Sequence, residues 1–181
     1  AHHIETQMLH QQSGIQDQLC SAFGGVNYIE MYAYPYASVS PIFVSNSVWW
    51  ELERRLALIF LGRSHSSSQV HEMVIRDLED AGPDNPKLEA LRQCADRSRD
   101  ALYAGDLDAL GQAMVANTDA QRNLHPQLIS GEADQIIAIA REYGALGWKV
   151  NGAGGEGGSA VGGADGGSMR SRALVSRPSS F

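Results

Sequence analysis

Three consecutive segments repeat apolar residues at the spacing of an amphipathic helix, and this pattern constrains the fold more than any other feature. The segments run over residues 87–103, 106–124 and 132–143. In the first of them, Leu88, Leu91 and Leu102 fall on one helical face. A turn sequence rich in Gly and Pro precedes the series at Gly82, and Gly144 ends it. A chain of 181 residues with this pattern predicts one helix-rich domain, or one domain and part of another.

Shorter segments between these helices have the pattern of strands. Residues 26–31 alternate like a half-buried strand, and residues 42–44 form a second candidate. Residues 56–61 are a continuous apolar run that predicts a buried strand, and residues 148–150 predict a strand that enters a glycine-rich loop. Further helices are expected over residues 1–11 and 15–23 and from about residue 69. Strands are therefore mixed with helices along the chain.

Composition excludes several classes of protein. The formal charge is −7, with a pI near 5.3, which argues against a general nucleic-acid binder, because such a protein needs a basic face. No apolar run reaches the ~18 residues of a membrane span. Cys20 and Cys94 stand alone without a CxxC pair, and His71-Glu72 lacks the second histidine four residues on that a zincin helix needs, so no metal site is predicted. Reduced thiols and the absence of a signal sequence favour the cytoplasm.

The glycine-rich loop over residues 151–159 is the first candidate for chemistry. Successive backbone N–H groups without Cβ atoms can form a concavity that binds phosphate. Gly152, Gly154 and Gly157 fit a GxGxxG pattern, but no helix is predicted after them, so a dinucleotide fingerprint is not indicated. The phosphate-loop hypothesis rests on Gly152, Ala153, Gly154 and Gly155. The alternative is a glycine-rich turn that leads into a linker.

The second candidate is Asp17, which lies between Gln16 and Gln18 in the first turn of a predicted helix. A carboxylate at this place can act as a general base on a hydroxyl, with the neighbouring amides orienting its surroundings. The alternative is that Asp17 is a helix-start acid favoured by the macrodipole alone.

The third candidate, the stretch Arg63-Ser64-His65, continues into a run of serines at a predicted helix start. These side chains could bind phosphate or sugar, with Gln16 as a further contact, or the hydroxyls could simply cap the helix. A serine hydrolase is disfavoured, because no GxSxG elbow occurs in the sequence.

Two of these segments together resemble the GHMP kinase superfamily, the galactokinase, homoserine kinase, mevalonate kinase and phosphomevalonate kinase group. They are Gly14-Ile15-Gln16-Asp17-Gln18 with Phe23-Gly24-Gly25, and the late Lys149-Val150-Asn151-Gly152-Ala153-Gly154-Gly155-Glu156-Gly157-Gly158. The heptose 7-phosphate kinase branch is the most similar, with support from residues 62–74. The resemblance covers roughly residues 1–161. It implies transfer of phosphate from ATP, with Mg²⁺, to a hydroxyl of a sugar or sugar phosphate. Asp17 would be the catalytic base, and Gly152 to Gly155 would border the phosphates.

The resemblance also implies an organisation. The fold class it gives is α+β in two layers: residues 1–45 as a remnant of the N-terminal kinase domain, residues 46–161 as a ferredoxin-like C-terminal domain, and residues 162–181 as a flexible tail. The family's main ATP loop is expected before Ala1, so the chain is interpreted as the later part of a kinase. The partners expected are a sugar-phosphate substrate and, for a homodimer, a second copy, but no nucleic acid and no membrane. The alternative function is a non-catalytic, kinase-like binding or assembly module.

Overall fold

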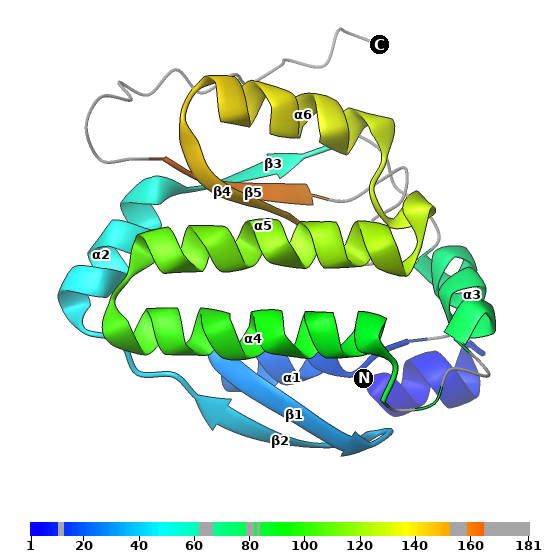
Figure 1. The fold of residues 1–181 in the computed structure, drawn as a ribbon. Helices are drawn as coiled ribbons and strands as arrows, with labels where there is room; N and C mark the ends of the chain where they lie inside the picture. The colour runs from blue at the N-terminus through cyan, green and yellow to red at the C-terminus, as the bar shows by residue number, and fades with distance from the viewer. Residues whose placement is uncertain (11–12, 62–66, 79–81, 83, 153–158, 165–181) are drawn as a thin grey trace, which may run out of the picture.

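The computed structural model describes residues 1–10, 13–61, 67–78, 82, 84–152 and 159–164. Helices and short antiparallel strands are mixed along the chain, which confirms the α+β class (Figure 1). The elements of the first half are η1 (Ile4–Met8), α1 (Gln16–Phe23), β1 (Asn27–Ala33), β2 (Tyr36–Pro41), α2 (Asn46–Arg55), β3 (Leu56–Phe60) and α3 (Ser67–Leu78). Those of the second half are α4 (Pro86–Ala104), α5 (Leu107–Leu124), η2 (Pro126–Leu128), α6 (Gly131–Glu142), β4 (Ala145–Val150) and β5 (Ser159–Ala164).

The two longest helices, α4 and α5, form an antiparallel pair at the middle of the molecule (Figure 1). The Asn85 side chain accepts a hydrogen bond from the N–H of Lys87 and so caps the start of α4, with Pro86 in the first turn. Gly105 ends α4 in the left-handed region at φ 67°, where a residue without Cβ is favoured. Asp106 then caps α5 through the N–H of Ala109. These signals confirm the predicted boundaries.

The three-stranded sheet has the order β3-β5-β4, and both pairings are antiparallel. The prediction of a strand at residues 56–61 is confirmed, but the prediction that it is buried is wrong. Every residue of β3 is exposed, with Leu58 and Phe60 each at 71%, because none of the apolar clusters among the described residues includes a side chain of this strand. Strand β5 extends through Ala164 and so includes the first residues of the segment predicted to be a flexible tail, residues 162–181; that tail stays a prediction. Residues 165–181 lie outside the described residues.

Strand β4 is packed more deeply than β1, β2 or β3, and α5 and α6 both contact it. In Figure 1 the sheet lies between these two helices. Trp148 and Val150 share an apolar cluster with Ile137 of α6, and the Arg141 guanidinium lies 5.0 Å from the centre of the Trp148 ring. This packing anchors the strand that leads into the glycine-rich loop.

Helix α5 crosses β4 at a contact between two glycines. A Cβ placed on Gly147 would stand 2.3 Å from the carbonyl oxygen of Gly111, so neither backbone has room for a side chain there. One residue further along β4, the carbonyl of Trp148 accepts a hydrogen bond of 3.2 Å from the fully buried Thr118 hydroxyl. The close approach and the buried hydrogen bond together fix the position of β4 on the helix.

Strands β1 and β2 form an antiparallel hairpin on the other side of α4 (Figure 1). The predicted strand at residues 42–44 is wrong, because the strand covers residues 36–41 instead. Ile42 follows it, buries its side chain against Leu52 and Leu102, and donates its N–H to the Val26 carbonyl at 2.8 Å. This apolar cluster joins residues from both sides of position 45, and the predicted domain boundary there stays a prediction.

Polar contacts also tie the hairpin to α4. The Tyr28 hydroxyl donates to Asp96 at 2.6 Å, and the Arg99 guanidinium lies 4.6 Å from the centre of the Tyr28 ring. The hydrogen bond to Asp96 is the main cause of a raised pKa at Tyr28.

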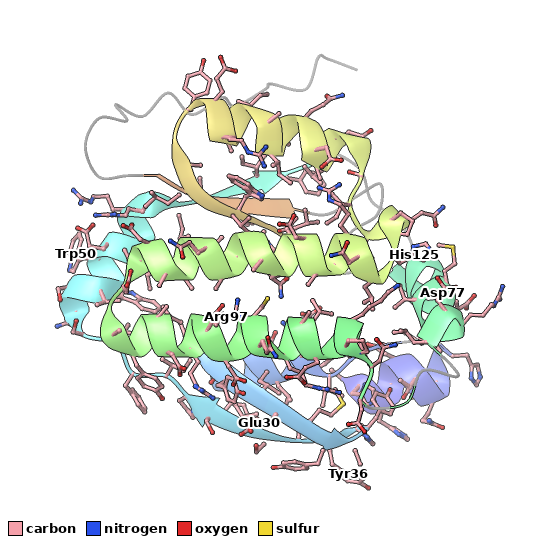
Figure 2. The ribbon with its side chains drawn as sticks, in the orientation of Figure 1. Glu30, Tyr36, Trp50, Asp77, Arg97 and His125 are labelled. Carbon is pink, nitrogen blue, oxygen red and sulfur yellow. The ribbon has the colours of Figure 1, made fainter. Side chains whose placement is uncertain are left out.

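Helix α3 packs on the far end of α5, where Leu124 and Leu128 form an apolar cluster with Met73 and Leu78. Asp77 and His125 lie beside one another at this junction, with 3.6 Å between their Oδ2 and Nε2 atoms (Figure 2).

Candidate functional site

Asp17 lies in the first turn of α1, as the sequence predicts, and its side chain is exposed. Ile15, just before the helix, is buried at 6% exposure and anchors this end of the element. Ile15, the N-cap residue, has no side chain that could cap the first N–H groups of the helix. The backbone carbonyl of Asp17 accepts a hydrogen bond of 2.7 Å from the Ser21 hydroxyl. The carboxylate is therefore displayed on a short, locally fixed helix.

A carboxylate that the sequence analysis missed lies next to this helix start. The Oε2 atom of Glu5, which belongs to η1, accepts hydrogen bonds from the Ser13 hydroxyl and from Nε2 of Gln18. Gln18 Nε2 also lies 3.1 Å from the Ser13 hydroxyl oxygen. We call these three residues the Glu5 network. Since Ser13 precedes Asp17 in the chain and Gln18 follows it, the network holds the backbone on both sides of the candidate base.

The hairpin turn contributes a further contact. The Tyr34 hydroxyl donates to the backbone carbonyl of Ser13 at 3.0 Å and lies 3.0 Å from Nε2 of His2. The His2 and Tyr34 rings meet edge to face, with 5.3 Å between their centres. Ser13, just before α1, is thus held by hydrogen bonds to both Glu5 and Tyr34. Gln16 is exposed beside Asp17 and shares no part of this arrangement.

Of the predicted phosphate loop, the structure describes the beginning. Gly152 follows β4 in a turn with φ 65°, and among the described residues nothing lies within 4 Å of the Cβ position that it lacks. Ala153, Gly154 and Gly155 lie outside the described residues, as do Arg63, Ser64 and His65. Asp17 and Gly152 come from separate parts of the fold. Helix α1 lies beside the hairpin near α4, whereas β4 lies across α5 (Figure 1). The predicted roles of the loop and of residues 63–65 stay predictions.

A half-buried lysine near the end of β4 is a second feature to which the sequence analysis gave no role of its own. Burial lowers the pKa of Lys149, and the nearby Cys94 thiol partly offsets that effect. The Lys149 ammonium donates to the Val150 carbonyl at 2.9 Å, so it supports the backbone that leads to Gly152. Lysine in the middle of an otherwise apolar strand was the available signal. A positive charge with little water around it favours a nearby anion.

Metal ligands are sparse in the described part of the chain. In those residues no group of three or more His, Cys, Asp or Glu side chains could hold a metal ion. Mg²⁺ on a nucleotide needs few protein ligands, because phosphates and water fill most of its coordination sites. Across the same residues, no helix combines the length and apolar character that crossing a bilayer requires.

Comparisons with known proteins agree with the sequence motifs. Residues 98–165 match the family described as GHMP kinases C terminal. The chain is 28% identical over 154 residues to D-glycero-alpha-D-manno-heptose 7-phosphate kinase of Campylobacter jejuni, covering 85% of this chain and 45% of that protein. It is 27% identical over 158 residues to the bifunctional fucokinase/GDP-fucose pyrophosphorylase of Arabidopsis thaliana, covering 86% of this chain and 15% of that protein.

Among solved structures, mevalonate kinase of L. major in complex with R-mevalonate aligns with a TM-score of 0.70 and 26% identity. The alignment covers 86% of this chain and 45% of that one. The chain thus spans less than half the length of these relatives. In its ordered motifs, in the match over residues 98–165 and in its fold, this chain is similar to the GHMP kinases.

Proposed function

We propose that the protein carrying this chain transfers phosphate from ATP to a hydroxyl of a sugar or sugar phosphate, with a heptose 7-phosphate as the substrate class. The observation that carries the proposal is the exposed Asp17 carboxylate on a short helix. Hydrogen bonds to Glu5 hold both the segment before this helix and its first turn. The similarity to a heptose 7-phosphate kinase supports the choice of substrate class. A location in the cytoplasm and a homodimer belong to the same proposal.

In this mechanism Asp17 accepts the proton of the acceptor hydroxyl. The hydroxyl oxygen forms a bond to the γ-phosphorus, and the bond from that phosphorus to the bridging oxygen of ADP breaks. The backbone N–H groups of the loop from Gly152 to Gly155 would face the phosphates, and among the described residues nothing lies within 4 Å of the Cβ position that Gly152 lacks. Lys149 adds positive charge near the start of the loop. Mg²⁺ bound with ATP would neutralise phosphate charge.

The test is Asp17→Asn, which keeps the shape of the side chain and removes its basicity. General-base catalysis is worth about 10² to 10⁴ in rate, so we expect kcat to fall at least ~10²-fold. Asp108→Asn is a matched control, since Asp108 is also an exposed acid in the first turn of a helix, α5. If Asp17 were only a helix-start acid, both variants would keep kcat within a few-fold of wild type. That result would remove Asp17 from the catalytic role.

A second candidate is a kinase-like module that binds a partner without catalysis. The observation that favours it is the amount of large apolar side chain on the surface, with Phe43 at 84% exposure and Trp50 at 71%, the latter labelled in Figure 2. Exposed apolar surface of this kind is typical of association sites. Equilibrium titration with MgATP separates the two candidates, because a kinase requires saturable nucleotide binding and this module does not.

A further inference from the structure

We propose that Asn117 and Gln121 of α5, together with Lys149 of β4, form a subsite that binds hydroxyl groups of the phosphate acceptor. The observation behind it is a pair of buried amide oxygens: in the part of the chain that the structure describes, no donor reaches Oδ1 of Asn117 or Oε1 of Gln121. The choice of ligand rests on the proposed function, whereas the geometry of the subsite stands on its own.

Asn117 lies on the side of α5 that faces α4. Leu110, Asn117 and Leu124 follow one another at intervals of seven residues, about two helical turns, so they share one stripe of α5. Leu110 packs on the apolar cluster that contains Leu102 of α4. Leu124 forms another cluster with Leu91, nearer the start of α4. Asn117 lies between these two contacts and therefore faces the middle of α4.

Gln121 follows Asn117 by one helical turn and lies beside it on the same face. Strand β4 lies next to this face, because the Thr118 hydroxyl donates to the Trp148 carbonyl. At about 100° per residue, the two amides lie about 100° and 60° around the helix from Thr118, in the same sense as Leu124. Asn117 and Gln121 therefore project between α4 and β4.

Lys149 reaches the same region from β4. Its two neighbours in the strand, Trp148 and Val150, turn toward the apolar cluster with α6. Because side chains alternate along a strand, Lys149 points to the opposite face of the sheet, where α5 lies. The Lys149 ammonium and the Cys94 thiol of α4 each influence the pKa of the other, which places them near one another. Cys94 belongs to the middle of α4 that Asn117 faces.

A purely structural role does not account for the two amides. They interrupt an otherwise apolar stripe, and a buried acceptor without a donor destabilises a fold rather than supporting it. Asn117, Gln121 and Lys149 are each half-buried, so a ligand can reach all three from solvent. Unpaired polar atoms at such a position are expected where a ligand supplies the missing partners.

The donor and acceptor types select the ligand. An amide oxygen only accepts hydrogen bonds, so two of them require hydroxyl donors and do not bond an ionised phosphate. The Lys149 ammonium has three N–H donors, and one of them goes to the Val150 carbonyl at 2.9 Å. The others can bind hydroxyl or phosphate oxygens. A sugar phosphate satisfies this whole set, whereas the phosphates of ATP would satisfy Lys149 alone.

The experiment measures binding of D-glycero-D-manno-heptose 7-phosphate by calorimetry, without ATP, to the protein that carries this chain. Asn117→Leu and Gln121→Leu each remove one amide and keep the size of the side chain. Asn123→Leu is the matched control, because Asn123 is an exposed amide on the same helix. We expect the Kd to rise roughly 10-fold in the first two variants, the scale of a lost hydrogen bond, and to stay within a few-fold in the control.

Titration with MgATP separates two sources of hydroxyls, the acceptor sugar and the ribose of ATP. The proposal predicts a Kd for MgATP within a few-fold of wild type in every variant. A loss confined to MgATP would assign the amides to the ribose and overturn the proposal.

Urea unfolding without ligand tests the unpaired amides independently of catalysis. Since leucine removes a buried acceptor that has no donor, we expect the unfolding midpoint of Asn117→Leu to equal or exceed that of the wild type. A lower midpoint would mean that the amide has a partner inside the protein, and would overturn the proposal whatever the Kd.

Failure of the subsite and failure of the proposed function give different results. An unchanged Kd for the heptose phosphate in both leucine variants, with phosphate transfer by the wild type, overturns the subsite alone. Full activity of Asp17→Asn, with heptose binding weakened in the leucine variants, removes the proposed base and leaves the subsite. A wild type that binds no heptose phosphate contradicts both.

Discussion

The contact between Gly111 of α5 and Gly147 of β4 predicts that Gly147→Ala strongly destabilises the fold. The new methyl carbon would stand 2.3 Å from the Gly111 carbonyl oxygen and 2.5 Å from its Cα. Both neighbours are backbone atoms, so no side chain can rotate away. The helix and the strand must separate by about 1 Å before the contact reaches an ordinary van der Waals distance.

The magnitude follows from two costs. Overpacking in a well-packed region costs about 1–3 kcal/mol. The same separation stretches the 3.2 Å hydrogen bond from Thr118 to the Trp148 carbonyl, and a lost buried hydrogen bond costs about 0.5–1.5 kcal/mol more. We expect a loss of roughly 2–4 kcal/mol in the free energy of unfolding, which corresponds to roughly 5–15 °C in Tm for a chain of this size.

Urea unfolding followed by circular dichroism measures this loss directly. Gly131→Ala is the control, because no atom of another described element lies within 4 Å of its Cβ position, and Gly131 is the first residue of α6. A substitution of that kind is neutral or stabilises by about 0.4–1 kcal/mol. If Gly147→Ala is as stable as Gly131→Ala, the close approach of α5 and β4 is not as described and the reasoning fails.

Two further predictions concern thiols and pH. A thiol reagent should modify Cys20 alone in the native chain, because Cys94 is 4% exposed and burial raises its pKa; equal labelling of both thiols would contradict this burial. The hydrogen bond from Arg122 lowers the pKa of Asp134 from its ordinary value of 3.8. The ion pair therefore stabilises the folded state fully above pH 3.8, and this stabilisation is lost as the pH falls through the lowered pKa of Asp134. Both side chains are exposed, so a double-mutant cycle should give a coupling free energy of about 0.2–1 kcal/mol between them near neutral pH and almost none near pH 2. A coupling free energy that stays the same in acid would refute the assignment.

The helices of the second half could be predicted because their signals are local. Asn85 and Asp106 cap α4 and α5 through their own side chains, and Gly105 ends α4 in a conformation that glycine adopts readily. The strands were harder to place. Residues 42–44 and 56–60 are similarly apolar, but the first segment buries Ile42 from a loop, whereas β3 lies exposed at a sheet edge. Apolar character alone does not show which neighbour covers a segment.

The candidate site divides in the same way. Asp17 could be selected from the sequence, because an acid at a helix start beside glycine is a local pattern. Glu5 could not, since its contacts to Ser13 and Gln18 depend on how η1 folds back toward α1. The half-buried position of Lys149 and the direction of its pKa shift likewise depend on tertiary packing around β4. The surroundings of Glu5 and Lys149 are set by contacts between elements, and the sequence pattern within a single element does not show such contacts.

The measurement that tests the central claim most directly is transfer of labelled γ-phosphate from MgATP to D-glycero-D-manno-heptose 7-phosphate by the protein that carries this chain, with wild type and Asp17→Asn in parallel. The account predicts a labelled sugar phosphate with the wild type and at least ~10²-fold slower formation with the variant. Absence of transfer by the wild type, or equal transfer by both proteins, would contradict it.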